Sequence, residues 1–186
     1  KRYKGIVHYW LTFNEINDTL ILPYLSAGVV IDPNEDKEQQ LYNAAHHILL
    51  ASAWAVKIGH EIDPNNMIGC MICGITFYPG TCDPKDIMAN RHMWEKSIFY
   101  CGDVQCKGKY GTYAKRLWAE HNVKLDITEQ DLIDFQTFHP VPYDTCTLSF
   151  FLSYAKSVRF ILRLLISLFC SISIRMHKFR KQKMLS

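Results

Sequence analysis

The sequence predicts an α/β fold in which parallel strands alternate with helices. Two runs without a charged residue or proline, 6–13 and 67–78, are rich in β-branched, aromatic and small apolar residues, as is typical of buried strands. Between them, residues 38–59 repeat apolar and small residues at helical spacing. Further helical segments and a third candidate strand, 146–152, follow. This order implies right-handed crossovers between parallel strands.

The first predicted strand, 6–13, is followed at once by polar residues: Asn14, Glu15, Asn17 and Asp18. A polar cluster therefore lies at the carboxyl end of that strand. Residues 23–37, which contain two prolines and a glycine and finish with acidic residues, predict a loop.

The helix predicted over 38–59 is the clearest element. Its apolar and small residues recur at three- and four-residue steps and form one face: Leu41, Ala44, Ala45, Ile48, Leu49, Ser52, Val56 and Gly59. A turn at Asp63-Pro64 ends this segment, and Pro79-Gly80 ends the strand 67–78.

Three more helices are predicted from their first turns. Asp83 caps a helix that reaches about Cys101, with Pro84 at the first helical position and Asp86 placed to reach back as in a capping box. Another helix covers 111–121. A short one starts at Thr128, with Asp131 three residues on.

The charge is divided between two parts of the chain. Residues 1–144 hold 13 basic and 18 acidic residues, a net −5, whereas 145–186 hold eight basic residues and no acidic one. The formal total of +3 therefore excludes a generally basic protein and gives no reason to infer a nucleic-acid partner. The length of 186 residues also excludes a complete (β/α)8 barrel, which needs about 250.

The character of the sequence changes from about residue 153. Leu164–Ile174 is uncharged, but its eleven residues are fewer than the roughly 18 that span a membrane. If helical, this part is a basic amphipathic helix that could lie on an anionic membrane. The alternative interpretation is a sequence with no selected fold.

The seven cysteines predict reduced thiols in a cytoplasmic protein, because their number is odd and no secretory segment opens the sequence. Cys70-x-x-Cys73 has the spacing of half a zinc site or a redox pair, but it lies in an apolar run where cysteine packs as a small hydrophobic residue. His46 and His47 are adjacent on a helix and point in different directions. We therefore expect no metal site.

The strongest candidate site is Thr12-Phe13-Asn14-Glu15. A carboxylate directly after a buried strand enters a cleft from a rigid base, and partial burial raises its pKa so that it can hold and donate a proton. Asn14 can donate and accept hydrogen bonds to hydroxyl groups. Asp18, close by, could orient either a loop or a substrate.

These residues belong to a longer resemblance. Tyr9-Trp10-Leu11-Thr12-Phe13-Asn14-Glu15-Ile16-Asn17 closely resembles the fourth-strand motif of glycoside hydrolase family 1. The likeness continues, in order and at family-like spacing, over most of residues 1–135. It is carried by Asn43-Ala-Ala-His-His-Ile-Leu-Leu-Ala-Ser-Ala, Ile68-Gly-Cys-Met, Tyr78-Pro-Gly-Thr-Cys-Asp-Pro-Lys-Asp, Asp103-Val-Gln-Cys-Lys-Gly-Lys-Tyr, Tyr113-Ala-Lys-Arg-Leu-Trp and Thr128-Glu-Gln-Asp-Leu.

The resemblance implies a partial (β/α)8 TIM barrel, about strands 4 to 6, over residues 1–145, with an unrelated hydrophobic and basic tail over 146–186. Asn-Glu followed by Ile-Asn is most similar to the 6-phospho-β-glucosidase branch, whose substrates are phosphorylated disaccharides and aryl β-glucosides. The resemblance makes Glu15 the general acid/base of retaining hydrolysis and Asn14 a ligand of the sugar 2-hydroxyl. It implies no cofactor and no metal.

A retaining glycosidase also needs a nucleophilic carboxylate, about 5–5.5 Å from the acid/base. The family carries it in a Glu-Asn-Gly motif, and none of the seven glutamates here is followed by asparagine. We therefore expect the chain to lack a nucleophile and to be inactive alone. Our hypothesis is that the reading frame is disrupted around residues 135–153. Ser149-Phe150-Phe151 resembles the family's sixth-strand tyrosine motif, but without its two tyrosine hydroxyls. The alternative function is a non-enzymatic, membrane-associated protein that uses the tail.

Overall fold

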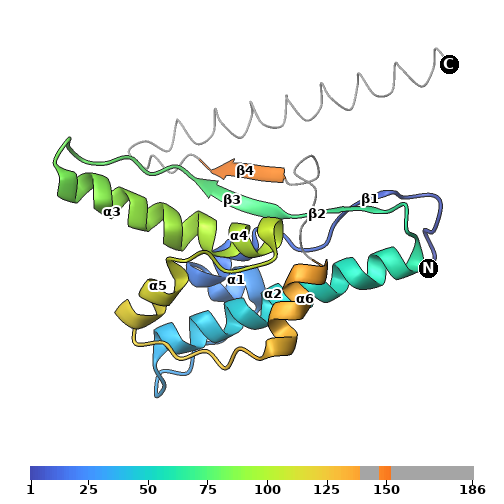
Figure 1. The fold of residues 1–186 in the computed structure, drawn as a ribbon, viewed down its shortest axis with the longest axis horizontal. Coiled ribbons are helices and arrows are strands. Elements are labelled where there is room, and N and C mark those ends of the chain that lie inside the picture. The colour runs from blue at the N-terminus through green and yellow to red at the C-terminus, as the bar shows by residue number, and fades with distance from the viewer. Residues whose placement is uncertain (139–146, 152–186) are drawn as a thin grey trace, which may run out of the picture. The chain divides into compact units, whose positions relative to one another are not determined.

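The computed structural model describes residues 1–138 and 147–151 (Figure 1). The predicted tail helix and nearly all of the predicted tail therefore lie outside the described residues. The elements, in chain order, are β1 (Tyr9–Leu11), the 3-10 helix η1 (Ile16–Leu20), α1 (Pro23–Ala27), α2 (Lys37–Ile62), β2 (Met67–Gly69), β3 (Met71–Ile75), α3 (Pro84–Trp94), the π-helix η2 (Glu95–Phe99), α4 (Tyr100–Lys107), α5 (Ala114–Glu120), α6 (Glu129–Phe138) and β4 (Thr147–Phe151).

The strands are parallel, as the order of elements predicts. β1 pairs with β2 in the register Tyr9 to Met67, and β3 pairs with β4 in the register Met71 to Thr147. Each pair is joined through helices, and Figure 1 shows α2, α4 and α6 on the same side of β2 and β3. The α/β class and the third strand over 146–152 are confirmed by this arrangement.

The prediction of one long buried strand over 6–13 was wrong. β1 has only three residues, and the side chains of Tyr9 and Leu11 are 78% and 48% exposed. Tyr9 and Leu11 lie on the same face of β1, and no described residue packs over that face enough to bury them. The strand predicted over 67–78 is interrupted at Cys70 and ends at Ile75.

Helix α2 organises the core. It begins one residue earlier and ends three residues later than predicted, and Asp36 caps it by accepting a hydrogen bond from the Gln39 amide at 2.7 Å. Its buried face packs with η1, β3, α4 and α6 around one apolar cluster, whose fully buried members include Tyr42, Ala45, Leu49, Tyr100, Val104 and Phe135.

The predicted starts of the helices at Asp83 and Thr128 are confirmed, with one correction. Asp83 accepts from the Lys85 amide at 2.7 Å, but Asp86 does not reach back to it, because its carboxylate accepts from the Thr81 hydroxyl at 2.6 Å. At α6, Thr128 and Asp131 form the reciprocal capping box, with bonds of 2.8 and 3.1 Å. The helix predicted over 111–121 is shorter, Ala114–Glu120.

The helix that starts at Pro84 continues past Cys101 to Lys107, but it does so through the π-helical segment η2. The Tyr100 amide donates to the carbonyl of Glu95, five residues back, instead of four. Glu95 is buried within this segment, and its carboxylate forms ion pairs with Arg91, at 2.8 Å, and with Arg116. Such segments are rare and are often found at functional sites.

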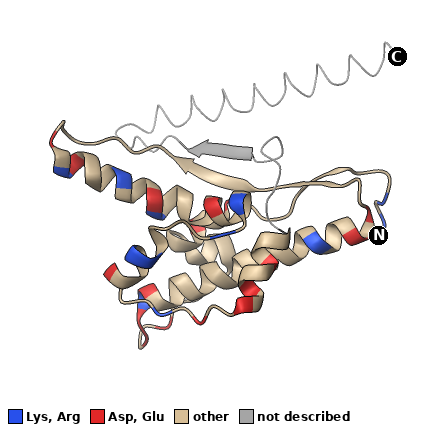
Figure 2. Ribbon diagram, in the orientation of Figure 1, with Lys and Arg blue, Asp and Glu red and all other residues tan. Residues whose placement is uncertain are grey.

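Charged residues are absent from β2 and β3 and lie with both signs mixed on helices such as α3 and α5 (Figure 2). In the described part of the chain, no helix has the length and apolar character needed to cross a membrane. Of the cysteines within 1–138, Cys70, Cys73 and Cys101 are buried and Cys82 is exposed.

Buried His46 ties α2 to α6. Its Nδ1 lies 2.9 Å from the Tyr110 hydroxyl and its Nε2 lies 3.5 Å from the Asp131 carboxylate, while His47 is exposed. Burial lowers the pKa of His46, because desolvation outweighs the opposing effect of Asp131. His46 therefore has a structural role, since it joins α2 to Tyr110 and to α6.

We expect the free energy of unfolding to fall as the pH is lowered from 7.5 to 5.5. The unfolded chain takes up a proton at this histidine near its ordinary pKa of 6.5, whereas folded His46 resists protonation until a lower pH. The stability that neutral His46 confers is therefore present above pH 6.5 and lost as the pH falls. Urea unfolding across this range should show a shallower pH dependence in His46→Gln. His47→Gln is the exposed control, and equal slopes in the two variants would contradict the assignment.

Candidate active site

Glu15 lies in a strained turn four residues after the end of β1. Its backbone adopts the left-handed conformation, with φ 46° and ψ 52°, which is uncommon for a residue with a Cβ. The Glu15 carbonyl accepts hydrogen bonds from the Asp18 amide at 2.9 Å and from the Ser26 hydroxyl at 3.3 Å. Strain of this kind persists only where the surroundings fix it, and it concentrates at functional sites.

The two residues predicted for substrate chemistry lie together. Asn14 is exposed, and its side-chain amide lies 3.5 Å from the carboxylate of Glu15, which is half-buried. The Asn14 side chain can therefore form hydrogen bonds with a molecule in the solvent, next to a Glu15 carboxyl group that is only partly accessible to that solvent. This geometry is compatible with the predicted roles, which it does not by itself assign.

Asn17, which the sequence analysis did not single out, fixes the turn to the rest of the fold. Its side-chain amide donates to the carbonyls of Cys73, at 3.0 Å, and Ser97, at 2.7 Å, and its side-chain oxygen accepts from the Cys73 amide at 2.8 Å. Asn17 is 1% exposed. The residue therefore joins η1 to β3 and to η2, and the only sequence signal was its place in the polar cluster after the first strand.

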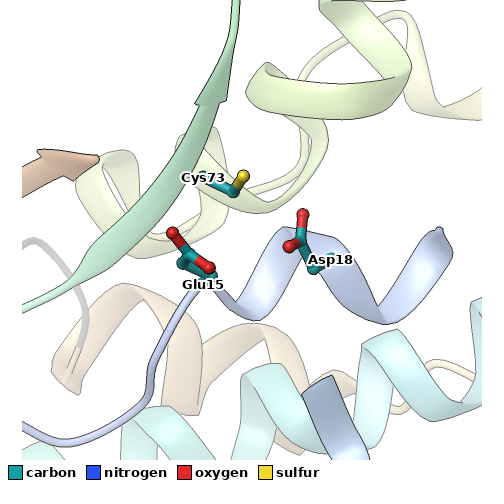
Figure 3. A group of neighbouring side chains, drawn as sticks. All are labelled: Glu15, Asp18 and Cys73. Atoms are coloured by element: carbon teal, nitrogen blue, oxygen red, sulfur yellow. The ribbon is translucent and has the colours of Figure 1, made fainter. Parts of the chain in front are cut away.

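A second group of side chains converges on Glu15. One carboxylate oxygen of Glu15, one carboxylate oxygen of Asp18 and the Sγ atom of Cys73 all lie within 4.8 Å of one another. Figure 3 shows Asp18, on η1, directed toward the thiol of Cys73, on β3, with Glu15 at the start of the same turn. Cys73 thus contributes its side chain to a polar cluster, whereas the sequence analysis expected only apolar packing.

The surroundings of Glu15 raise its pKa above the ordinary value of a glutamate. Partial burial raises its pKa first, the Asp18 carboxylate raises it further, and the hydrogen bond from Asn14 opposes both effects. Burial also raises the pKa of Asp18, against the effect of a hydrogen bond from Cys73. A carboxyl group whose pKa is moved toward neutrality can act as a proton donor.

The same three residues include the ligand types of a metal site, but the chemistry of the thiol favours another role. Burial and the two neighbouring carboxylates raise the pKa of Cys73 to about 12. Metals bind the thiolate, whereas this thiol retains its proton near neutral pH and can donate it to Asp18.

An apolar cavity of about 410 Å³ lies elsewhere, between the N-terminal residues, β1 and the last turns of α2. Trp10 lines it, and the Trp10 indole N–H is 3.2 Å from both the Val7 carbonyl and the Asn66 side chain. Glu15 and Asn14 do not line this cavity. The candidate site is therefore separate from this cavity, and the polar side chains described above define it.

Comparison with known proteins gives one consistent result. The model of the family described as "Glycosyl hydrolase family 1" matches residues 1–158. A 6-phospho-beta-glucosidase of Clostridium longisporum is 48% identical over 143 residues, which are 74% of this chain and 30% of that protein. An aryl-phospho-beta-D-glucosidase of Bacillus subtilis is 43% identical over 157 residues, 84% of this chain and 33% of that protein. The chain thus spans about a third of these relatives.

Solved structures agree on the fold. A beta-glucosidase from Exiguobacterium marinum has a TM-score of 0.62 at 24% identity, covering 80% of this chain and 33% of its own. A family 1 β-glucosidase from Thermotoga maritima has a TM-score of 0.61 at 23% identity, covering 80% of this chain and 32% of its own. At such identities the likeness shows the fold alone.

Proposed function

The chain belongs to glycosyl hydrolase family 1, and we propose that it is part of a retaining β-glycosidase that hydrolyses 6-phospho-β-glucosides. Two kinds of observation support the substrate class. The named relatives at 43–48% identity are a 6-phospho-beta-glucosidase and an aryl-phospho-beta-D-glucosidase. The sequence carries Asn14-Glu15-Ile16-Asn17, the form of the motif most similar to that branch. In this proposal, disaccharides and aryl glucosides that are phosphorylated during uptake are the substrates, and the protein acts on them in the cytoplasm.

In this proposal, Glu15 is the general acid that protonates the leaving oxygen and later the base that activates water. The observation that carries the role is a half-buried carboxyl group, held in a left-handed turn after a barrel strand, whose pKa is raised. Asn14, adjacent and exposed, would bind the sugar 2-hydroxyl. Neither role uses a cofactor or a metal.

The sequence contains no Glu-Asn-Gly motif, so the proposal assigns the nucleophile to a segment that this chain does not supply. Retaining hydrolysis proceeds through attack of that carboxylate on the anomeric carbon. Without it, protonation by Glu15 alone leaves the first step without an attacking group. We therefore expect the 186-residue chain to show no turnover of an aryl 6-phospho-β-glucoside.

A chimeric enzyme tests the proposal. The matching 143-residue segment of the Clostridium longisporum enzyme is replaced by the corresponding residues of this chain, so that the relative supplies the remaining strands. We expect the chimera to hydrolyse 4-nitrophenyl 6-phospho-β-glucoside with retention of the anomeric configuration. Proton NMR, which identifies the anomer that is formed first, measures this outcome. A folded chimera without activity would contradict the proposal, as would an inverted product.

A further inference from the structure

Two carboxyl groups share one small space in the candidate site. Glu15 precedes η1 and Asp18 lies within its first turn, and the two side chains are within 4.8 Å of each other. Two like charges at this separation, on side chains that are half-buried, disfavour simultaneous ionisation. The pair therefore binds its first proton more tightly than two separate carboxyl groups would.

The surroundings decide which member carries that proton. The thiol of Cys73 donates to Asp18, and this hydrogen bond favours the ionised form of Asp18. Glu15 accepts a hydrogen bond of 3.5 Å from the exposed Asn14 amide. The Cys73 thiol therefore favours the negative charge on Asp18, against the effect of burial, which raises the pKa of Asp18 and leaves its Oδ1 without a hydrogen-bond partner.

Cations do not neutralise the pair. In the described part of the chain, the ion pairs of lysine, arginine and histidine are made with other acidic residues. The titratable groups that act on the pair from neighbouring elements are thiols, Cys73 from β3 and Cys101 from α4. Burial keeps both thiols protonated, since it raises each pKa to about 12. Among the described residues, therefore, no ion pair with a cation offsets the mutual repulsion of the two carboxylates.

We propose that Asp18 is a positioning residue that holds a single proton on Glu15: Asp18 stays ionised, and Glu15 keeps the proton that it delivers to the leaving group. This role rests on the proposed function of Glu15. Cys73 also contributes, because its thiol stabilises the Asp18 anion. The hydrogen bonds between the Asn17 side chain and the Cys73 backbone hold that thiol in place. Neither Asp18 nor Cys73 needs to touch the sugar.

Carbon-13 NMR titration of the full chain, labelled at the side-chain carboxyls of Glu and Asp, tests this inference. Glu15 is assigned by the resonance that disappears in Glu15→Gln. In the wild-type chain, the Glu15 and Asp18 resonances should each show both protonation steps of the pair. In Asp18→Asn, Glu15 should titrate in a single step at lower pH. In Cys73→Ala, Asp18 should titrate at higher pH.

Asp126→Asn is the control, since it removes the same charge from an exposed position. It should leave the Glu15 titration unchanged. Single-step, independent titration of Glu15 and Asp18 in the wild-type chain would overturn the inference even if Asp18→Asn failed to fold. An unshifted Glu15 in a folded Asp18→Asn chain would also overturn it.

The chimeric enzyme separates this inference from the proposed function. If both hold, Asp18→Asn should move the alkaline limb of the kcat/KM profile to lower pH, because Glu15 then loses its proton more easily. A purely structural role of Asp18 would lower activity without moving that limb. If the folded chimera is inactive while the titration shows coupled steps, the carboxyl pair stands and the proposed function fails.

Discussion

Replacing Glu15 by glutamine in the chimeric enzyme is expected to lower kcat/KM for a poor leaving group by about 100- to 10,000-fold, the usual contribution of general acid–base catalysis. Glutamine has nearly the same shape but cannot give a proton to the leaving oxygen. The loss should be much smaller for formation of the glycosyl intermediate from a nitrophenyl substrate, because that leaving group departs without protonation. Comparison of alkyl and nitrophenyl 6-phospho-β-glucosides measures this difference.

Glu38→Gln is a suitable control, since Glu38 is a partly buried glutamate that pairs with Lys96 and His121 outside the candidate site. It should leave kcat/KM within about threefold of the parent chimera, as the change removes no group from the reaction. Equal losses for both substrates in Glu15→Gln would contradict the acid role, because an acid acts most strongly on the poorer leaving group.

Replacing Asn17 by alanine is expected to reduce the free energy of unfolding by about 3 kcal/mol or more, since each buried polar group left without a partner costs about 1–3 kcal/mol. The variant would leave three backbone groups without their side-chain partner: the amide and carbonyl of Cys73 and the carbonyl of Ser97. Urea unfolding monitored by circular dichroism measures the change.

Asn14→Ala provides the matched comparison three residues earlier. Asn14 is exposed and makes one long contact, so its replacement should change stability by no more than about 0.5 kcal/mol. Similar losses in the two variants would show that Asn17 does not anchor the turn. If the Asn17→Ala variant unfolded at the same urea concentration as the wild type, that result would also contradict the anchoring role of Asn17.

The sequence was informative where local chemistry determines structure. Residues of α2 repeat at helical spacing, and the side chains of Asp83 and Thr128 accept hydrogen bonds from amides in the first turns of their helices. The exposure of β1 could not be read in the same way. Its apolar composition is that of a strand with two covered faces, and exposure depends on which neighbours are present.

The site was predictable in part, for a similar reason. The adjacency of Asn14 and Glu15 is a property of the sequence, and the family motif marks both. Cys73, however, lies 56 residues from Asn17 along the chain and meets it only through the pairing of β3 with the turn. No periodicity or spacing in one sequence indicates that contact, so the carboxyl pair and its thiol neighbour emerged only from the fold.

The π-helical segment η2 holds one residue more than an ordinary helical turn, because the Tyr100 amide donates five residues back to the Glu95 carbonyl. Deletion of a single codon within Glu95–Phe99 would therefore restore ordinary α-helical spacing and leave Tyr100 and Val104 near the core face. The same deletion would move the Ser97 carbonyl, which accepts a hydrogen bond from Asn17. A genetic lesion too small to shift the reading frame would thus disturb the candidate site more than the core.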